Sequence, residues 1–441
     1  MAVTDPTERR TLVLRFADLG IVTYGSLRIV GDPQRTVTWV VEEPILLAAL
    51  AELDSALPEP VAGESAVDAI ERAMQRGPFA TPASELMLAY RLGVLLLSAD
   101  AWQLLTDTVS DPRAVLFVAP SVRLARVPWG LLAAPAIRPT AEELVRARTA
   151  AITAAGRAAA EIPWPAVDPG ELTEGHRLNE LVDVLFTVPV GIVQSPRPAV
   201  SWQQRAGRPP LLILDPRIPG QLPDSALGSV LGKPSADTPL GRHFAQRLRT
   251  GPVLPAVGDV VELFRRPDAD RAWLADVLDS EPARLLFVGH ATATGQDAGS
   301  SALYLAEDRP LQAAELATAG LPVPPRVALL ACASAGDYRF DEARGLVAAM
   351  VLGGAQLVTA VLWSLPTTAG YRRFTPPAAD PAADPMAALV SAVDDAHTET
   401  DAGCAVNRWQ RAQMRRLRDG DTTANPIWWA ALASFAVDGA R

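Results

Sequence analysis

The chain has 441 residues, of which 49% are hydrophobic and 20% are charged, and its formal net charge is −10. This much apolar material argues against a disordered protein and suffices for one large α/β unit or two to three smaller domains. The negative charge disfavours non-specific nucleic-acid binding, because no net positive field attracts phosphates. The Arg-rich stretches around Arg265 and Arg415 are short and mixed with acids, and we expect both to be solvated helix faces.

Two cysteines, Cys332 and Cys404, occur in the chain. A secreted disulfide scaffold carries more in a shorter chain, so the count is typical of a reducing compartment. The first residues lack the basic segment, apolar core and cleavage site of a secretory signal. The charge-free stretch 345–366 contains two adjacent glycines and a β-branched second half, which indicates a helix, a turn and a buried strand rather than a membrane span. These features predict a cytoplasmic protein that does not enter the membrane.

The first hundred residues change from a strand pattern to a helix pattern. Residues 11–42 alternate or run apolar, with a turn at 31–33, and predict two or three strands. From Pro44 to Thr106, apolar residues recur at three- and four-residue spacing between Pro and Gly breaks, which predicts several helices.

After Pro112, short apolar runs alternate with helical segments. The predicted strands cover residues 114–119, 211–214, 284–288, 327–330 and 357–363. We expect the last of these to be the final clear strand, and an Ala-rich helix to cover about 140–161. Runs that are apolar throughout indicate strands buried on both faces. The pattern therefore predicts an α/β fold with a mostly parallel sheet sandwiched by helices.

Two of these strands end at side chains that are typical of nucleophilic catalysis. One is followed by Gly289 and His290, and the other by Ala331 and Cys332. The stretch between them is long enough for a crossover that makes the strands parallel neighbours, whose carboxyl ends form the ligand-binding edge of the sheet. There the imidazole would take the thiol proton and produce a nucleophilic thiolate. An isolated cysteine or histidine is more often structural, so spacing alone leaves both interpretations open.

The carboxyl-terminal part of the chain resembles the CHAT domain, a caspase-like peptidase module related to separase. The matching blocks are, in order, ARLLFVGHATATG, LYLAED with LQAAELA, RVALLACASAGDYRFDEARGLVAAMVLGGAQLVTAVLWSLP and NPIWWAALASFAVDG. AVLFVAPSVRLARVPWGLLAAP resembles an earlier strand and turn of the family. The resemblance implies a CHAT domain over 86–441, with an upstream non-catalytic half at 114–220 and a catalytic half at 250–441. Residues 1–85 would then be a regulatory or docking region of strands and helices.

By position, the resemblance implies that His290 is the catalytic histidine and Cys332 the nucleophile. The oxyanion hole would be formed by the backbone N–H group of Cys332 together with that of Ala291 or of a nearby residue in the loop through Gly295. A backbone carbonyl would suffice to orient the histidine. Two departures put the competence of the site in doubt. Family members usually have Gly at the position of Ala291, and often Glu at that of Ala333. Alanine restricts backbone angles that glycine allows.

Three acids follow the nucleophile, namely Asp337, Asp341 and Glu342. They suit a solvated helix start, because carboxylates complement the positive end of the helix dipole. Alternatively, one of them lies in an acidic pocket for a substrate Arg or Lys, since relatives in the caspase clan often prefer basic residues.

The remaining candidate ligands have unremarkable contexts. His176, His243 and His397 lie in polar segments and are expected to be solvated surface groups, and Cys404 is expected to be structural, near the start of a surface helix. Their spacing predicts no metal site, and we expect no cofactor.

Three functions remain open. The first is a cysteine endopeptidase that cleaves a protein or peptide substrate through an acyl-enzyme, with an activating signal or a regulatory protein partner. The resemblance implies a role in bacterial stress, defence or cell-death regulation. The departures at 291 and 333 motivate the alternative of a catalytically inactive interaction or scaffold module. A different thiol acyl-transfer reaction is the third, because a fold does not fix a function.

Overall fold

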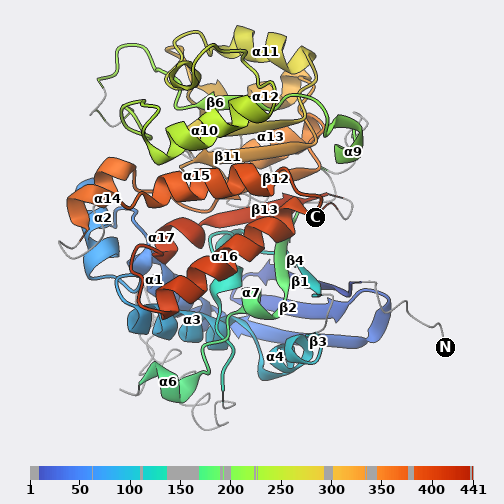
Figure 1. Ribbon diagram of the computed structural model, residues 1–441. Coiled ribbons are helices and arrows are strands. Elements are labelled where there is room, and N and C mark those ends of the chain that lie inside the picture. The colour runs from blue at the N-terminus through green and yellow to red at the C-terminus, as the bar shows by residue number, and fades with distance from the viewer. Residues whose placement is uncertain are drawn as a thin grey trace. The chain divides into compact units, whose positions relative to one another are not determined.

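The computed structural model describes residues 9–61, 63–109, 113–136, 168–188, 192, 200–222, 225, 227–292, 301–332, 334, 345–375, 382–437 and 440. The chain forms two compact units, each built around β-strands (Figure 1). The first contains residues 1–185 together with Gln410–Pro426, and the second contains Phe186–Trp409 together with Ile427–Arg441. The predicted helix at 140–161 lies outside the described residues.

The first unit begins with an antiparallel meander. β1 (Thr11–Leu19), β2 (Val22–Ile29) and β3 (Asp32–Glu42) pair in sequence order. β1 also pairs in parallel with β4 (Val115–Ala119). The turns between the three strands contain Gly20 and Gly31, both at positive φ, where an L side chain would be strained. The prediction of two or three strands over 11–42 is confirmed, with three formed.

Four helices follow the meander, as the helix pattern predicts. They are α1 (Glu43–Ala56), α2 (Ala66–Gln75), α3 (Pro82–Leu96) and α4 (Ala99–Thr106). Ser65, Thr81 and Ser98 precede the last three and accept a hydrogen bond from a backbone N–H of the first turn. Such caps satisfy donors that have no partner inside the helix. The short helices α6 (Pro169–Leu172) and α7 (Leu178–Leu181) come later in this unit.

The second unit contains a mostly parallel sheet, which is what the sequence predicts. Its strands lie in the order β13 (Leu432–Ala436), β12 (Leu357–Val361), β11 (Arg326–Ala331), β7 (Arg284–Gly289) and β6 (Leu211–Leu214). The last four are mutually parallel, and β13 is antiparallel to β12. β13 also pairs in parallel with the end of β5 (Asp183–Thr187).

The prediction that 357–363 is the last clear strand is wrong, because β13 follows it. The segment LASFA is rich in alanine and serine, which have little strand preference of their own. Backbone pairing with β12 and β5 makes it a strand.

Helices cover both faces of this sheet. Every residue of β7, β11 and β12 is buried, which requires a covering layer on each side. α12 (Ala313–Ala319) and α13 (Leu346–Leu352) pack together, while α10 (Pro239–Thr250) and α15 (Pro385–Ala396) lie side by side in front of the strands in Figure 1. Further helices are α9 (Trp202–Arg205), α11 (Arg271–Asp279), α14 (Thr368–Phe374), α16 (Ala402–Arg418) and α17 (Pro426–Trp429).

The charge-free stretch forms α13, a turn at Gly353 and Gly354, and β12, as predicted. Across the described ranges, no helix combines the length and the apolar character that crossing a membrane requires.

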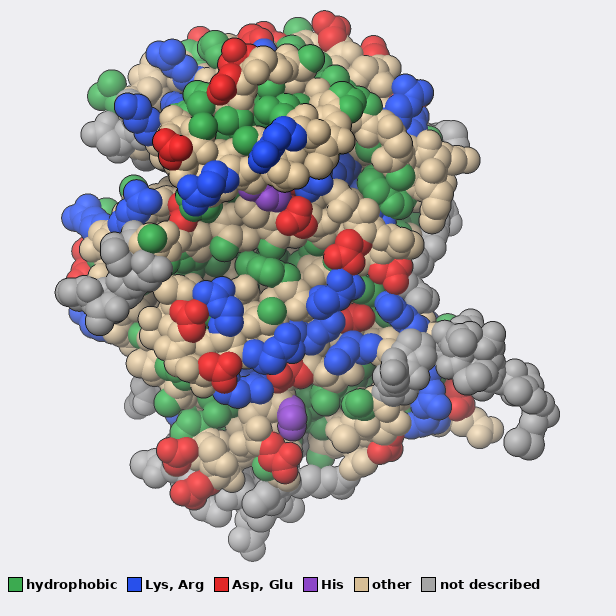
Figure 2. All heavy atoms as spheres, in the orientation of Figure 1, with side chains coloured by type: hydrophobic (Ala, Val, Ile, Leu, Met, Phe, Trp, Pro, Cys, Tyr) green, Lys and Arg blue, Asp and Glu red, His purple; other side chains and the backbone are tan. Residues whose placement is uncertain are grey.

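Lys and Arg side chains gather over α16 in the space-filling view (Figure 2). Arg415, Arg416 and Arg418 are exposed at the end of this helix. Arg416 pairs with Asp421, and Arg418 pairs with Glu180. The prediction of a solvated helix face is therefore confirmed for the stretch around Arg415. It is wrong for Arg265, which lies between two helices and pairs at 3.2 Å with the buried carboxylate of Asp215.

Candidate active site

His290 and Cys332 follow the carboxyl ends of two neighbouring parallel strands. β7 pairs with β11, and the last residues in register are Gly289 and Ala331. His290 directly follows Gly289, and Cys332 directly follows Ala331. Because paired strands lie about 4.8 Å apart, the two backbones are close together where they leave the sheet. The prediction that these two strands are parallel neighbours is confirmed, and both residues leave the sheet at the edge where such folds bind ligands.

The His290 ring is half-buried and is held by a backbone carbonyl. Its Nε2 lies 2.9 Å from the carbonyl oxygen of Gly228. A carbonyl can only accept, so Nε2 carries the hydrogen, and the neutral ring has its lone pair on Nδ1. Sequence reasoning anticipated an orienting carbonyl without identifying Gly228, because every residue has a carbonyl and its use leaves no signature in the sequence.

Cys332 is half-buried, and a buried serine fixes the turn behind it. The backbone N–H of Ser334 donates to Ala331 O at 3.1 Å, and its hydroxyl donates to Leu329 O at 2.6 Å. The same hydroxyl accepts from the N–H of Val361 on β12 at 3.1 Å. Ser334 therefore joins β11 to β12 two residues after the cysteine, a role that the sequence analysis did not foresee.

Ala291 lies in a short strand, and its backbone does not need glycine. β8 (Ala291–Thr292), β9 (Ala302–Leu303) and β10 (Leu311–Gln312) form a small antiparallel sheet. Ala291 pairs with Leu303, and the N–H of Tyr304 donates to His290 O at 3.0 Å. This bonding pattern is that of a non-hydrogen-bonded pair, so the N–H of Ala291 points away from β9. Extended backbone suits any L residue, and the departure from glycine therefore causes no backbone strain here.

The predictions for the residues that follow Cys332 cannot be compared with the structure. Ala333, Asp337, Asp341 and Glu342 lie outside the described residues, so the two interpretations of the acids remain predictions.

Two of the three remaining histidines differ from expectation. His176 is exposed, as predicted. His397 is 1% exposed, and its Nε2 lies 2.8 Å from Thr359 Oγ1. Burial, with Arg284 and Arg326 nearby, lowers the pKa of His397 to about 3. His243 is half-buried, with Nε2 2.9 Å from Asp394 Oδ2. The prediction of solvated surface groups is wrong for His243 and His397.

Cys404 lies near the start of α16, as predicted, and is buried rather than at a surface.

His243, Asp394 and Asp395 are close enough together to hold a cation, but their surroundings favour ion pairs. Arg247 donates to Asp394 Oδ2 from Nε at 2.9 Å and from Nη2 at 2.5 Å. Arg284 Nη1 lies 2.6 Å from the other carboxylate oxygen. Two guanidinium groups already neutralise this buried carboxylate, so we interpret the cluster as structural.

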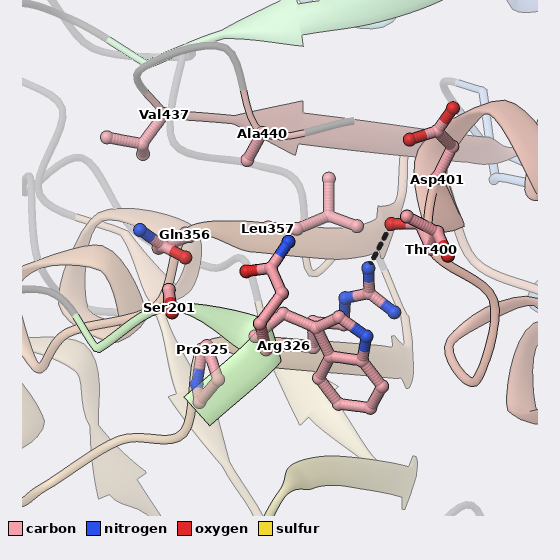
Figure 3. Close-up of a pocket in the computed structure, with 11 residues that line it drawn as sticks. Ser201, Pro325, Arg326, Gln356, Leu357, Thr400, Asp401, Val437 and Ala440 are labelled. Carbon is pink, nitrogen blue, oxygen red and sulfur yellow. Dashed lines mark hydrogen bonds between the residues drawn. The ribbon is translucent and has the colours of Figure 1, made fainter. Parts of the chain in front are cut away.

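A cavity of about 290 Å³ lies at the opposite edge of the sheet, where β11 and β12 begin (Figure 3). The guanidinium carbon of Arg326 lies over the face of the Trp202 ring, 3.9 Å from its centroid, and burial lowers the pKa of Arg326 to about 10. It donates to His397 O at 3.0 Å and to Thr400 O at 2.5 Å. Its guanidinium is occupied by backbone carbonyls, and the cavity is separate from the edge that carries His290 and Cys332.

No curated protein is significantly similar to this chain. Two similar solved structures are crystal structures of the Saccharomyces cerevisiae separase–securin complex, with 10% and 11% identity and a TM-score of 0.42 each. Each match covers 97% of this chain and 30% of the solved chain, so the chain spans less than a third of the length of these proteins. The family model described as "CHAT domain" matches residues 91–440. This match covers well over half of the sequence and follows the blocks on which the resemblance rested, and the chain therefore belongs to the CHAT domain family.

Proposed function

We propose that this chain is a caspase-like cysteine peptidase, with Cys332 as the nucleophile and His290 as the general base. The observation that carries the proposal is the register of β7 and β11, because each residue directly follows the last paired position of its strand. The contact between His290 Nε2 and Gly228 O supports it, since a ring held in this tautomer keeps the Nδ1 lone pair that a base needs.

The reaction has two halves. His290 takes the thiol proton, and the sulfur of Cys332 bonds to the carbonyl carbon of the scissile peptide. The C–N bond then breaks as the imidazolium gives its proton to the leaving amine, which leaves a thioester on the enzyme. Water then attacks the thioester carbonyl while His290 accepts one of its protons. The C–S bond breaks as the imidazolium returns that proton to the sulfur, which releases the carboxylic acid and regenerates the thiol.

The tetrahedral intermediates carry a negative oxygen, for which we propose the N–H groups of Ala291 and Cys332 as donors. The pairing of Ala291 with Leu303 supports this role, because its N–H is not used by the strand ladder. One such donor lowers the barrier by about 3–4 kcal/mol.

We assign the activity to a protein or peptide substrate. A carboxylate among Asp337, Asp341 and Glu342 would attract an Arg or Lys of that substrate. The family resemblance supports a role in the bacterial cytoplasm, in proteolysis linked to stress, defence or cell death and controlled by an activating signal or a protein partner.

The test is alkylation of the intact chain by iodoacetamide between pH 5 and 9, with each cysteine followed by peptide mass spectrometry. A thiolate stabilised by His290 keeps Cys332 reactive below the ordinary thiol pKa of about 8.5, and His290→Ala restores an ordinary profile. Cys404 is the internal control, because it lies in α16 and its profile is expected to be the same in both proteins.

A peptide-based electrophile extends the test to catalysis. Labelling of Cys332 that is lost in His290→Ala supports the peptidase. Identical alkylation profiles for the parent chain and His290→Ala would overturn the dyad and favour an interaction module with the same fold.

A further inference from the structure

The loop that carries Gly228 is tied to a buried carboxylate at the end of the neighbouring strand. Asp215 directly follows β6 and is 1% exposed. Its backbone has a φ of 53°, in the left-handed region, so the chain turns sharply at this residue. The N–H of Asp215 donates to Val288 O at 2.6 Å. Val288 lies on β7, two residues before His290, so Asp215 is fixed to the strand that carries the histidine.

The side chain of Asp215 contacts the two residues that follow Gly228. Ser229 Oγ lies 2.6 Å from Asp215 Oδ2 and 2.8 Å from Gly232 O, and its single hydrogen is assigned to the carboxylate because a charged acceptor binds it more strongly. The N–H of Val230 donates to Oδ1 at 3.3 Å. Arg265 Nη1 donates to Oδ2 at 3.2 Å and balances the charge of the carboxylate. A buried carboxylate that accepts several hydrogen bonds holds its partners firmly, because releasing any of them leaves part of its charge unsatisfied.

We propose that Asp215 is a positioning residue for His290, acting through Ser229 and the carbonyl of Gly228. This inference rests on the proposed function and concerns how its general base is held. The path runs from the Asp215 carboxylate to Ser229, along one peptide unit to Gly228 O, and from there to His290 Nε2. A carbonyl fixed in this way keeps the hydrogen on Nε2 and the lone pair on Nδ1.

Asp215 has no free oxygen for a substrate cation. Both of its carboxylate oxygens are engaged within the protein, one of them by Arg265. Its effect on the reaction therefore passes through the histidine, and its loss is expected to lower kcat and leave KM nearly unchanged.

The first experiment compares Ser229→Ala with Ser229→Thr in the intact chain. The alanine variant removes the hydroxyl that bonds Asp215, whereas threonine keeps it. The chain has four histidines, so the ring ¹⁵N signals of His290 can be assigned by comparison with His290→Ala. We expect the Nε2–H tautomer in the parent chain and in Ser229→Thr, and a mixture of both tautomers in Ser229→Ala.

The second experiment measures iodoacetamide alkylation of Cys332 at pH 6 in the same variants and in Asp215→Asn. A misplaced base is expected to lower the rate by tenfold to a hundredfold, because small displacements of a reacting group cost rates of that order. Ser229→Thr is expected to retain the parent rate, and Cys404 to react equally in all of them. Thermal unfolding shows whether each variant is folded. If Asp215→Asn is not folded, the comparison of Ser229→Ala with Ser229→Thr decides whether Asp215 positions the histidine.

The outcomes separate the two proposals. If His290→Ala changes the Cys332 profile while Ser229→Ala leaves both tautomer and rate at parent values, the dyad stands and the positioning role of Asp215 is overturned. If His290→Ala changes nothing, the proposed function and this inference fall together.

Discussion

The imidazole of His397 is enclosed by the second unit, with its Nε2 next to Thr359 Oγ1. Burial, reinforced by the positive charges of Arg284 and Arg326, lowers its pKa to about 3, whereas the ordinary value is 6.5. Between these two pH values the unfolded chain binds one proton more than the folded chain. The free energy of unfolding therefore falls as the pH falls through this window, by about 1.4 kcal/mol per pH unit from this group.

We expect His397→Asn to remove this part of the pH dependence. The measurement is urea unfolding at several pH values between 7.5 and 4.5, compared for the parent chain and the variant. His176→Asn is the matched control, because His176 is exposed and its loss should leave the slope as it was. Parallel curves for the parent chain and His397→Asn would show that His397 is not held neutral by the fold.

His290 and His397 show which kinds of residue environment can be predicted from the sequence. His290 was predictable because the strand before it, the glycine and its position at a strand end are all local signals. His397 follows α15 in the polar segment DDAHTET, which predicts a surface residue. Its burial arises from Thr359 on β12 and from the guanidinium groups at the starts of β7 and β11, which tertiary structure alone brings together.

At the scale of elements, local signals specify the helices and the long apolar strands, and pairing specifies the rest. The three-to-four spacing predicted helices over residues 44–106, and the structure adds that side-chain caps at Ser65, Thr81 and Ser98 begin α2, α3 and α4. β13 has no such signal, because it becomes a strand through partners that are distant in sequence. The pairing of β7 with β11 could be predicted because each strand is apolar after its first residue, an arginine, and is followed directly by a reactive side chain.

The packing of α10 beside α15 depends on the ion pairs of Asp394. This side chain is fully buried on α15 and is contacted by His243 and Arg247 from α10 and by Arg284 from β7. Against the opposing effect of burial, the charges of Arg284 and Arg247 and the hydrogen bond with His243 hold the pKa of the Asp394 carboxyl below its usual range. Removing the charge would leave Arg284, which is 3% exposed, without its partner.

We expect Asp394→Asn to lower the free energy of unfolding by about 3–5 kcal/mol, as when one member of a buried ion pair is lost. The neighbouring Asp395 is the control, because its side chain is 66% exposed and its ion pair with Arg247 is therefore in contact with solvent. Asp395→Asn should change the free energy of unfolding by less than about 1 kcal/mol. Denaturant unfolding of both variants at pH 7 measures the difference, and equal effects would mean that the α10–α15 contact does not rest on the buried carboxylate.

At the scale of the whole molecule, the alternation of apolar runs and helices predicted the α/β class, and the division into two units was beyond sequence reasoning. The segment Gln410–Pro426 returns to the first unit more than two hundred residues after that unit's main part ends. Its Asn425 side chain donates to Phe79 O at 2.8 Å, across 346 positions of sequence. Neither a change of composition nor a linker in the sequence indicates that Gln410–Pro426 belongs to the first unit, because tertiary contacts alone place it there.

This organisation predicts that residues 86–441 do not fold when residues 1–85 are removed. The truncation deletes β1, so β4 loses the parallel neighbour with which it pairs. It also deletes Glu85, which pairs with Arg177 while both side chains are under 8% exposed, and a buried guanidinium without its partner is strongly destabilising. The carbonyl of Phe79, to which the Asn425 side chain donates, is deleted as well. We expect the fragment to be insoluble, or to bind a hydrophobic dye and to unfold without a cooperative transition, while the full-length chain does neither. A soluble fragment with a sharp unfolding transition and native near-ultraviolet circular dichroism would instead make residues 1–85 a separable docking module, because its removal would then leave the packing of the remaining chain intact.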